Sequence, residues 1–306
     1  MAAPVLNAPS ALATPQASTF RFFPSTEPLS HFVEYYYTAE VLGDFTAGLE
    51  LTRLPEVEAK FVFAIEEGNH LPGGIGLGGG LRACLFLQPA HLPVIRIPDS
   101  IRQAVGASLR PSGLRLLLPR GADGLADAPL LPLDELWGAE GRELLDRLVL
   151  EETAVLRLAL LQRYLESRVR HLARPNRSAR RAFELIEAAH GEISTEALAR
   201  ACGCTSRTLR NATIAEAGLA PKHLARIARI RYALNLLVGA GVPLSTAAAS
   251  SAFSDYAHMS REFRELIGQP PARLGQKIHS ACIPAFNAER NLLSTGLLVV
   301  PKSAAP

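Results

Sequence analysis

The chain has 306 residues, of which 48% are hydrophobic and 20% are charged, and this ordinary globular composition leaves room for two domains with real cores. The net charge of +3 hides an uneven distribution. Residues 170–277 hold 16 Lys and Arg against 8 Asp and Glu, whereas the rest of the chain holds 16 against 21. A basic C-terminal part on an acidic N-terminal part is typical of a nucleic-acid-binding domain joined to another domain, although solvated arginine-rich helices would give the same count.

The first 18 residues are rich in Ala and Pro and carry no charged side chain. Without a basic segment or an unbroken apolar run they predict a disordered leader rather than a signal peptide. Residues 232–254 also lack charge, but Asn235, Pro243, two glycines and several serines make them too polar and too broken to cross a bilayer. We therefore expect a cytoplasmic protein with no membrane partner.

Short apolar runs broken by Pro and Gly predict a β-rich unit between residues 20 and 118. The expected strands cover residues 35–41, 49–53, 60–65, 83–87 and 102–109. From residue 133 onward the apolar spacing changes to three and four residues, which predicts helices at about 140–150 and 152–171. Residues 171–178 contain Arg-Pro-Asn and are the expected joint between two domains.

Every element after this joint is expected to be helical. A first helix runs from about residue 178 to 190. Ser194 and Thr205 are placed to cap the next two helices, and a long helix opens at Pro221 and ends at glycines 239 and 241. A short helix then begins at Pro243, and Ser254 is placed to cap the helix after it.

The same local order of elements occurs twice in this region. A short apolar helix (196–201, then 246–251) is followed by a tight turn, a capped helix with exposed arginines (206–217, then 255–267) and a Gly-x-x-Pro sequence. This is a helix-turn-helix repeated within one chain, and the connecting helix of about 20 residues would span about 30 Å. Since one turn of B-DNA is about 34 Å long, both second helices could enter successive major-groove segments.

The run from Ser194 to Leu274 resembles the DNA-binding domain of AraC-type transcription regulators. Residues 252–271, AFSDYAHMSREFRELIGQPP, are similar to that family's GFSDxSHFSRxFKxxxGxxP signature, with Ala252 for Gly and Met259 for Phe. Pro221-Lys222 and Arg231-x-x-x-Asn-Leu-Leu also fit the connecting helix. The first unit departs from the pattern, because Asn211 and Thr213 replace the expected Arg and Phe.

The N-terminal part resembles a domain of unknown function that is paired with such DNA-binding domains in some regulators. The matching pieces are Phe23-Pro24, Leu54-Pro55, Arg110-Pro-Ser-Gly113 and Leu133-Asp-Glu-Leu-Trp-Gly138. We therefore expect an α+β protein: a disordered leader (1–18), a β-rich N-terminal sensor or dimerisation domain with trailing helices (19–172), an all-α DNA-binding domain of two helix-turn-helix motifs joined by a long helix (177–277), and a C-terminal tail (278–306).

The resemblance implies a sequence-specific transcription regulator that acts on double-stranded DNA. Further partners open to such a protein are a small-molecule effector at the N-terminal domain, RNA polymerase and a second copy of the chain. Exposed side chains near the start of each recognition helix are the expected base readers, and basic side chains on the connecting helix are the expected phosphate contacts. The base-reading set is Ser206, Arg207, Arg210, Asn211, Tyr256, Ala257, His258 and Arg261, and the phosphate set is Lys222, Arg226 and Arg229.

Three other classes of function compete with a transcription regulator: an enzyme, a metal-binding sensor and a non-catalytic interaction module. Gly74-Ile-Gly-Leu-Gly-Gly79 has the letters of a dinucleotide-binding loop, but a strand-like run follows where such a site needs a helix. A fused DNA-repair methyltransferase would need a reactive cysteine, and Cys84 and Cys282 have apolar neighbours instead. Cys202 and Cys204 lack a second pair at zinc-site spacing, and His31, His70 and His91 are scattered, so we expect no enzyme, no cofactor and no metal. A non-catalytic interaction module that has lost DNA binding remains the first alternative, ahead of a DNA-repair enzyme fused to an AraC-like domain.

Overall fold

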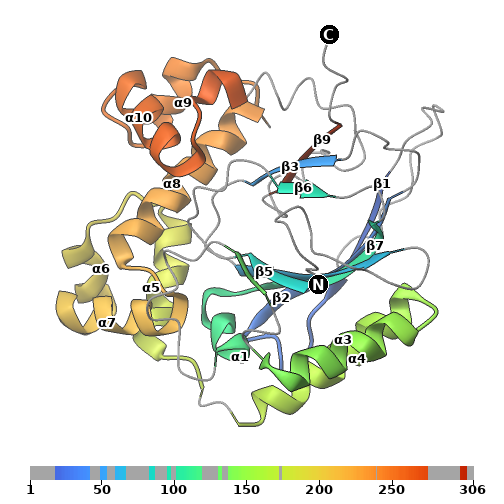
Figure 1. Cartoon of the computed structure of the whole chain (residues 1–306). Helices are drawn as coiled ribbons and strands as arrows, with labels where there is room; N and C mark the ends of the chain where they lie inside the picture. The colour runs from blue at the N-terminus through green and yellow to red at the C-terminus, as the bar shows by residue number, and fades with distance from the viewer. Residues whose placement is uncertain are drawn as a thin grey trace.

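The computed structural model describes residues 18–41, 49–53, 59–66, 83–86, 95–97, 101–118, 130–132, 137–171, 174–238, 240–274 and 297–301. Strands dominate its N-terminal half and helices its C-terminal half, as Figure 1 shows, so the α+β class expected from the sequence is confirmed. The leader expected at 1–18 lies outside the described residues except for Ser18, which opens the first strand. The Gly-rich segment at 74–79 also lies outside them.

Six antiparallel strands form the main sheet in the order β1-β2-β7-β4-β5-β8. Their bounds are β1 (Ser18–Pro24), β2 (Val33–Val41), β4 (Ala59–Glu66), β5 (Ala83–Phe86), β7 (Ile101–Leu109) and β8 (Leu130–Pro132). The long strands β2 and β7 lie side by side, with Tyr36 opposite Ala107. A 3-10 turn, η1 (Pro111–Gly113), and the short helix α1 (Leu114–Leu117) follow β7 directly.

A second antiparallel sheet has the order β6-β3-β9, with β3 (Leu49–Arg53), β6 (Ile95–Ile97) and β9 (Leu297–Pro301). Strand β9 lies within residues 278–306, which the sequence predicts to be a separate C-terminal tail. Its residues pair along the whole of β3, from Arg53 opposite Leu297 to Leu49 opposite Pro301. The end of the described chain therefore returns to the N-terminal domain.

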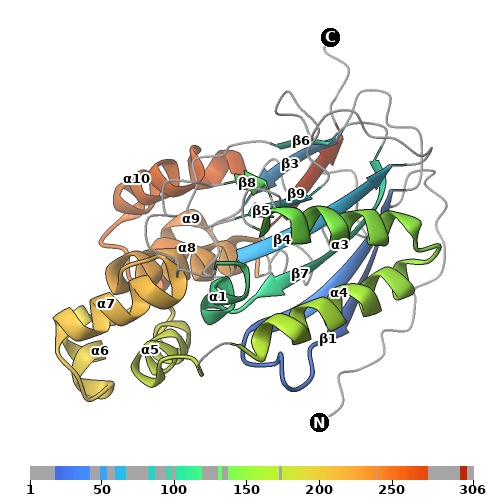
Figure 2. The ribbon, with the colours of Figure 1, turned by 60° about the horizontal axis from the view of Figure 1, so that its bottom comes forward.

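Two helices, α3 (Ala139–Leu150) and α4 (Ala154–Val169), lie across one face of the main sheet (Figure 2). The core between them joins strand residues such as Phe63 and Val105 to helix residues such as Leu148 and Leu161, all at most 1% exposed. Thr153 caps α4 by accepting a hydrogen bond from the Leu156 N–H. Burial of this apolar stripe is what holds the helix pair on the sheet.

The helical domain consists of α5 (Arg177–Ala188), α6 (Thr195–Ala201), α7 (Ser206–Ala217), α8 (Pro221–Val238), α9 (Leu244–Ser250) and α10 (Tyr256–Ile267). Helix α8 serves two cores. Its first half supplies Leu224 and Ile227 to a cluster with α5, α6 and α7, and its second half supplies Ile230 and Leu234 to a cluster with α9 and α10. Within the described part of the chain, no helix has the length and apolar character required to span a membrane.

Candidate DNA-binding interface

The first helix-turn-helix unit consists of α6, a short turn and α7. Ser194 caps α6 by accepting from the Ala197 N–H at 3.1 Å, and Thr205 caps α7 by accepting from the Thr208 N–H at 3.1 Å, so both caps expected from the sequence are confirmed. Leu198 and Leu209 anchor the two helices to α8 at 1% and 0% exposure. Arg207, Arg210 and Asn211 lie on the exposed side of α7.

The second unit, α9 and α10, has the same layout with one change in its cap. The sequence favoured Ser254 as the cap, but Asp255 occupies that position and accepts from the His258 N–H at 2.6 Å. Both residue types cap helices well, and the extended backbone of Asp255 directs its carboxylate at the first turn. The negative charge of Asp255 also favours the positive end of the helix dipole, and hydrogen bonding lowers the pKa of its carboxyl group.

Both turns contain a left-handed backbone position, and they differ in the residue that occupies it. Gly203 in the first turn has φ +67°, and Ala252 in the second turn has φ +53°. Ala252 occupies the position where the AraC-type signature quoted above has glycine. The left-handed region costs an L-amino acid about 1–2 kcal/mol, whereas glycine occupies it freely. The second turn therefore holds a strained residue.

Replacing Ala252 with glycine is expected to raise the free energy of unfolding by roughly 0.5–1 kcal/mol, since relief of strain exceeds the extra chain entropy of glycine. Urea unfolding monitored by circular dichroism measures this difference. Gly203→Ala is the matched control, because a Cβ there meets nothing within 4 Å and tests the backbone alone, and it should lower stability by a similar amount. A loss of stability in Ala252→Gly would contradict the assignment of strain.

The predicted readers of the first unit converge on one hollow in the surface. Ser206, Arg207, Arg210, Asn211 and Lys222 all line a cavity of about 490 Å³, and its other lining residues are uncharged. Arg207, Arg210 and Lys222 are exposed and form no ion pair within the described residues. Three cations without a neighbouring carboxylate in the lining make this hollow suited to a polyanion.

The predicted readers of the second unit lie on the exposed side of the first two turns of α10. Tyr256 is 40% exposed, and Ala257 and Arg261 are also exposed. His258 is half-buried, and its Nδ1 lies 3.3 Å from the Ser254 N and 3.2 Å from the Ser254 Oγ. Because the Ser254 N–H donates to Nδ1, the neutral ring carries its proton on Nε2 and presents a donor there.

Two of the three residues expected to contact phosphate have partners inside the protein. Arg226 donates to Glu262 at 2.7 Å and pairs with Glu265 at 2.7 Å, which ties α8 to α10. Burial alone would lower the pKa of Arg226, but these two carboxylates outweigh it and raise the pKa. Arg229 donates to the Gly191 carbonyl at 3.2 Å and lies over the Phe253 ring. Both arginines therefore have partners within the protein, and the phosphate contacts expected of Lys222, Arg226 and Arg229 remain predictions.

The first unit has Thr213 where the AraC-type pattern has Phe, and the equivalent position of the second unit shows how the two residues pack. Phe263 of α10 is fully buried, and Thr213 occupies the corresponding place on α7, also at 0% exposure. The Thr213 hydroxyl donates to the Arg210 carbonyl at 3.1 Å, so its polar group is satisfied within the helix. Within the described residues, the N-terminal domain packs against α7 through η1 and α1, and it makes at most minor contact with α9 and α10.

This domain contact centres on a buried carboxylate that sequence reasoning did not single out. Glu216 of α7, with a side chain only 6% exposed, binds the Arg115 guanidinium of α1 at 3.2 Å. Its Oε1 also accepts from the Asn176 N–H at 3.0 Å, in the joint between the domains. Arg115 and Glu216 are 101 positions apart, so no local pattern connects them.

The C-terminal part of the chain is similar in sequence to known proteins. A family model described as a helix-turn-helix domain matches residues 198–277. A probable AraC family transcriptional regulator from Rhodopseudomonas palustris is 30% identical over 33% of this chain and 97% of its own (TM-score 0.31). The C-terminal domain of AraT, a response regulator from Geobacillus stearothermophilus, is 21% identical over 34% and 88% (TM-score 0.32).

A longer match is ToxT from Vibrio cholerae, with 10% identity over 86% of this chain and 97% of its own (TM-score 0.42). The curated proteins contain no match to the chain. The helix-turn-helix model spans nearly all of the two units described above, and the R. palustris relative is matched over almost its whole length. Through this C-terminal domain, the chain belongs to the AraC family of helix-turn-helix transcription regulators.

Proposed function

We propose that the protein reads a specific DNA sequence with both units, α7 and α10 entering adjacent segments of the major groove. The observation that carries this proposal is the cationic hollow on the first unit, which gathers four predicted base readers and one predicted phosphate contact. Helix α8 places the two recognition helices at its two ends, and its 18 residues span about 27 Å, close to one turn of B-DNA.

Roles within the interface follow from the chemistry of the exposed groups. Arg207, Arg210 and Arg261 would bind guanine, and Asn211 would bind adenine. Ser206 and the His258 Nε2–H would donate to base or phosphate acceptors, and Tyr256 and Ala257 would contact thymine methyl groups. Lys222 would hold a phosphate and fix the register of the domain without reading sequence.

The experiment that tests this function is binding of purified protein to DNA selected from a random pool, measured by fluorescence anisotropy at several salt concentrations. Affinity should fall steeply as salt rises, because phosphate contacts release counterions. Failure to select any sequence at low salt would favour the alternative, a non-catalytic interaction module. An effector at the N-terminal domain, contact with RNA polymerase, homodimer formation and a cytoplasmic location remain predictions of the sequence.

Base readers and phosphate contacts should respond differently to truncation. Arg261→Ala is expected to reduce discrimination at one base pair of the selected site by about 1–3 kcal/mol, because a guanine-specific donor pair is lost. Lys222→Ala should weaken all sequences equally and lower the salt slope by about 1. Arg264→Ala, on the exposed last turn of α10, is the matched control and should change neither quantity. Equal effects of Arg261→Ala and Lys222→Ala on all sequences would refute the assignment.

A further inference from the structure

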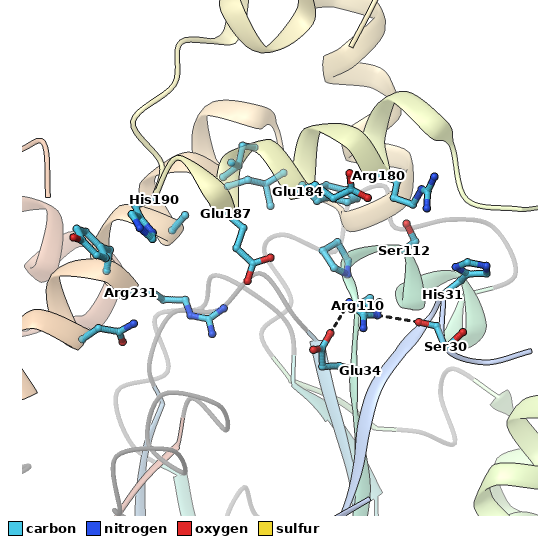
Figure 3. Close-up of a pocket in the computed structure, with 17 residues that line it drawn as sticks. Ser30, His31, Glu34, Arg110, Ser112, Arg180, Glu184, Glu187, His190 and Arg231 are labelled. Carbon is cyan, nitrogen blue, oxygen red and sulfur yellow. Dashed lines mark hydrogen bonds and ion pairs between the residues drawn. The ribbon is translucent and has the colours of Figure 1, made fainter. Parts of the chain in front are cut away.

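A cavity of about 500 Å³ lies between the two domains, and this volume is in the range of small-molecule sites. One wall comes from the turn before β2 and the segment after β7, and the other comes from α5 and α8 (Figure 3). A molecule held here would touch both domains at once. The cavity is separate from the DNA-facing hollow, since the two share no lining residue.

The helical side of the cavity contributes an apolar surface. Ile186 and Leu224, at 2% and 0% exposure, belong to the core of the first helix-turn-helix unit, and Phe183 and Ala228 pack against that core. All four line the cavity. Of these four, Phe183 and Ala228 are partly exposed and offer an apolar surface that the hydrocarbon body of an occupant would cover.

The charged residues that line the cavity are Glu34 and Arg110 on the N-terminal wall and Arg180, Glu184, Glu187 and Arg231 on the helical wall. Glu184 pairs with Arg181 at 3.4 Å, and Arg231 has an interaction of its own within the protein. On the N-terminal wall, Arg110 binds Glu34 at 2.8 Å and the Ser30 carbonyl at 2.9 Å, so this pair is internally satisfied. On α5, Arg180 and Glu187 have no hydrogen bond or ion pair from their side chains within the described residues. They are seven positions apart, which places them on one face of the helix about 10 Å from each other.

An aromatic pair stands at the Glu187 end of the cavity. The rings of His190 and Tyr232 are stacked with centroids 4.0 Å apart and an interplanar angle of 2°. His190 has φ +49°, a conformation that costs energy for any residue except glycine. This conformation ends α5, because the Gly191 N–H that follows donates to the Ile186 carbonyl at 2.9 Å, the hydrogen bond of a helix C-cap. The stacked rings line the cavity together with Glu187, whose carboxylate has no hydrogen bond or ion pair within the described residues.

We propose that the cavity binds an amino acid with a planar cationic side chain, represented by L-arginine. Its guanidinium would bind the Glu187 carboxylate and lie against the His190–Tyr232 pair, and its methylene chain would cover the apolar surface. Its carboxylate would bind Arg180. The Glu187 carboxylate and the Arg180 guanidinium, neither of which has a partner within the described residues, match the two charged ends of an extended zwitterion.

Isothermal titration calorimetry of the full chain with L-arginine, in the absence of DNA, tests the proposal. We expect Glu187→Gln and Arg180→Gln each to raise the Kd about tenfold or more, since each removes one charge-assisted contact. Glu192→Gln and Arg177→Gln are the matched controls, because both residues are exposed beside α5 and line no part of the cavity. Their Kd should equal that of the unaltered chain.

Agmatine, which is arginine without its carboxylate, separates the two charge contacts. Its binding should be weakened by Glu187→Gln and unaffected by Arg180→Gln. Absence of binding by L-arginine up to about 10 mM, or equal effects of the cavity and control variants, would overturn the proposal. Since no DNA is present, these outcomes are independent of whether the DNA-binding proposal holds.

Discussion

Phe263→Ala is expected to lower the free energy of unfolding by about 3–5 kcal/mol and to abolish DNA binding. The Phe263 ring is fully buried in the cluster that joins α8, α9 and α10, where it packs with Ile230, Leu234 and Met259. Its removal leaves a cavity that rigid helices on three sides cannot fill. Because α10 is anchored by this ring, the loss should displace the predicted readers on its other face.

Urea unfolding and anisotropy with the selected DNA measure the two effects of Phe263→Ala. The matched control is Thr213→Ala, at the equivalent position of the first unit, where one methyl group and one internally bonded hydroxyl are lost. We expect a cost of about 1 kcal/mol there. Equal losses in the two variants would mean that the units pack alike, contrary to the asymmetry seen between α7 and α10.

The two units also differ in how their recognition helices are supported at the junction of the domains. The second unit completes its own core with a large aromatic residue, whereas α7 carries a small buried Thr213 and packs against η1 and α1 of the N-terminal domain. The first recognition helix is thus supported partly by another domain. Helix α10, in contrast, is tied to α8 through Arg226 and its two carboxylates.

Local features of the fold could be predicted from the sequence because their causes lie within a few residues. The cap at Thr205 needs only the N–H three positions on, and the strands expected at 49–53 and 102–109 are marked by apolar runs between turn-forming residues. The cap of α10 was assigned one residue early, since Ser254 and Asp255 both suit that position and only backbone geometry separates them.

Features that depend on distant partners could not be predicted in this way. Strand β9 is a short apolar run in the sequence, and it forms a strand by pairing with β3, which is far away in the chain. Arg226 has the pattern of a phosphate contact, and its carboxylate partners are reached only when α10 folds back on α8. The residues on α7 that the sequence predicts to read bases lie together around one hollow, and their role remains a prediction.

Glu216→Ala is expected to lower the free energy of unfolding by about 2–4 kcal/mol and to loosen the two domains. The substitution removes an acceptor that binds Arg115 and the Asn176 N–H, and it leaves a guanidinium only 20% exposed without its carboxylate. A broken buried ion pair costs more than an exposed pair contributes, because the remaining charge is poorly solvated. Glu216→Gln should cost less, since its amide oxygen can still accept both hydrogen bonds.

A double-mutant cycle of Arg115→Ala and Glu216→Ala, measured by urea unfolding, isolates the coupling between the domains. The matched control is the exposed pair Arg181 and Glu184 on α5, separated by 3.4 Å, for which we expect less than about 0.5 kcal/mol. Proteolysis at the joint near Asn176 should accelerate in Glu216→Ala and stay unchanged in the control. If the buried pair couples no more strongly than the exposed one, α7 does not depend on the N-terminal domain, and a signal from that domain would need another route to the DNA.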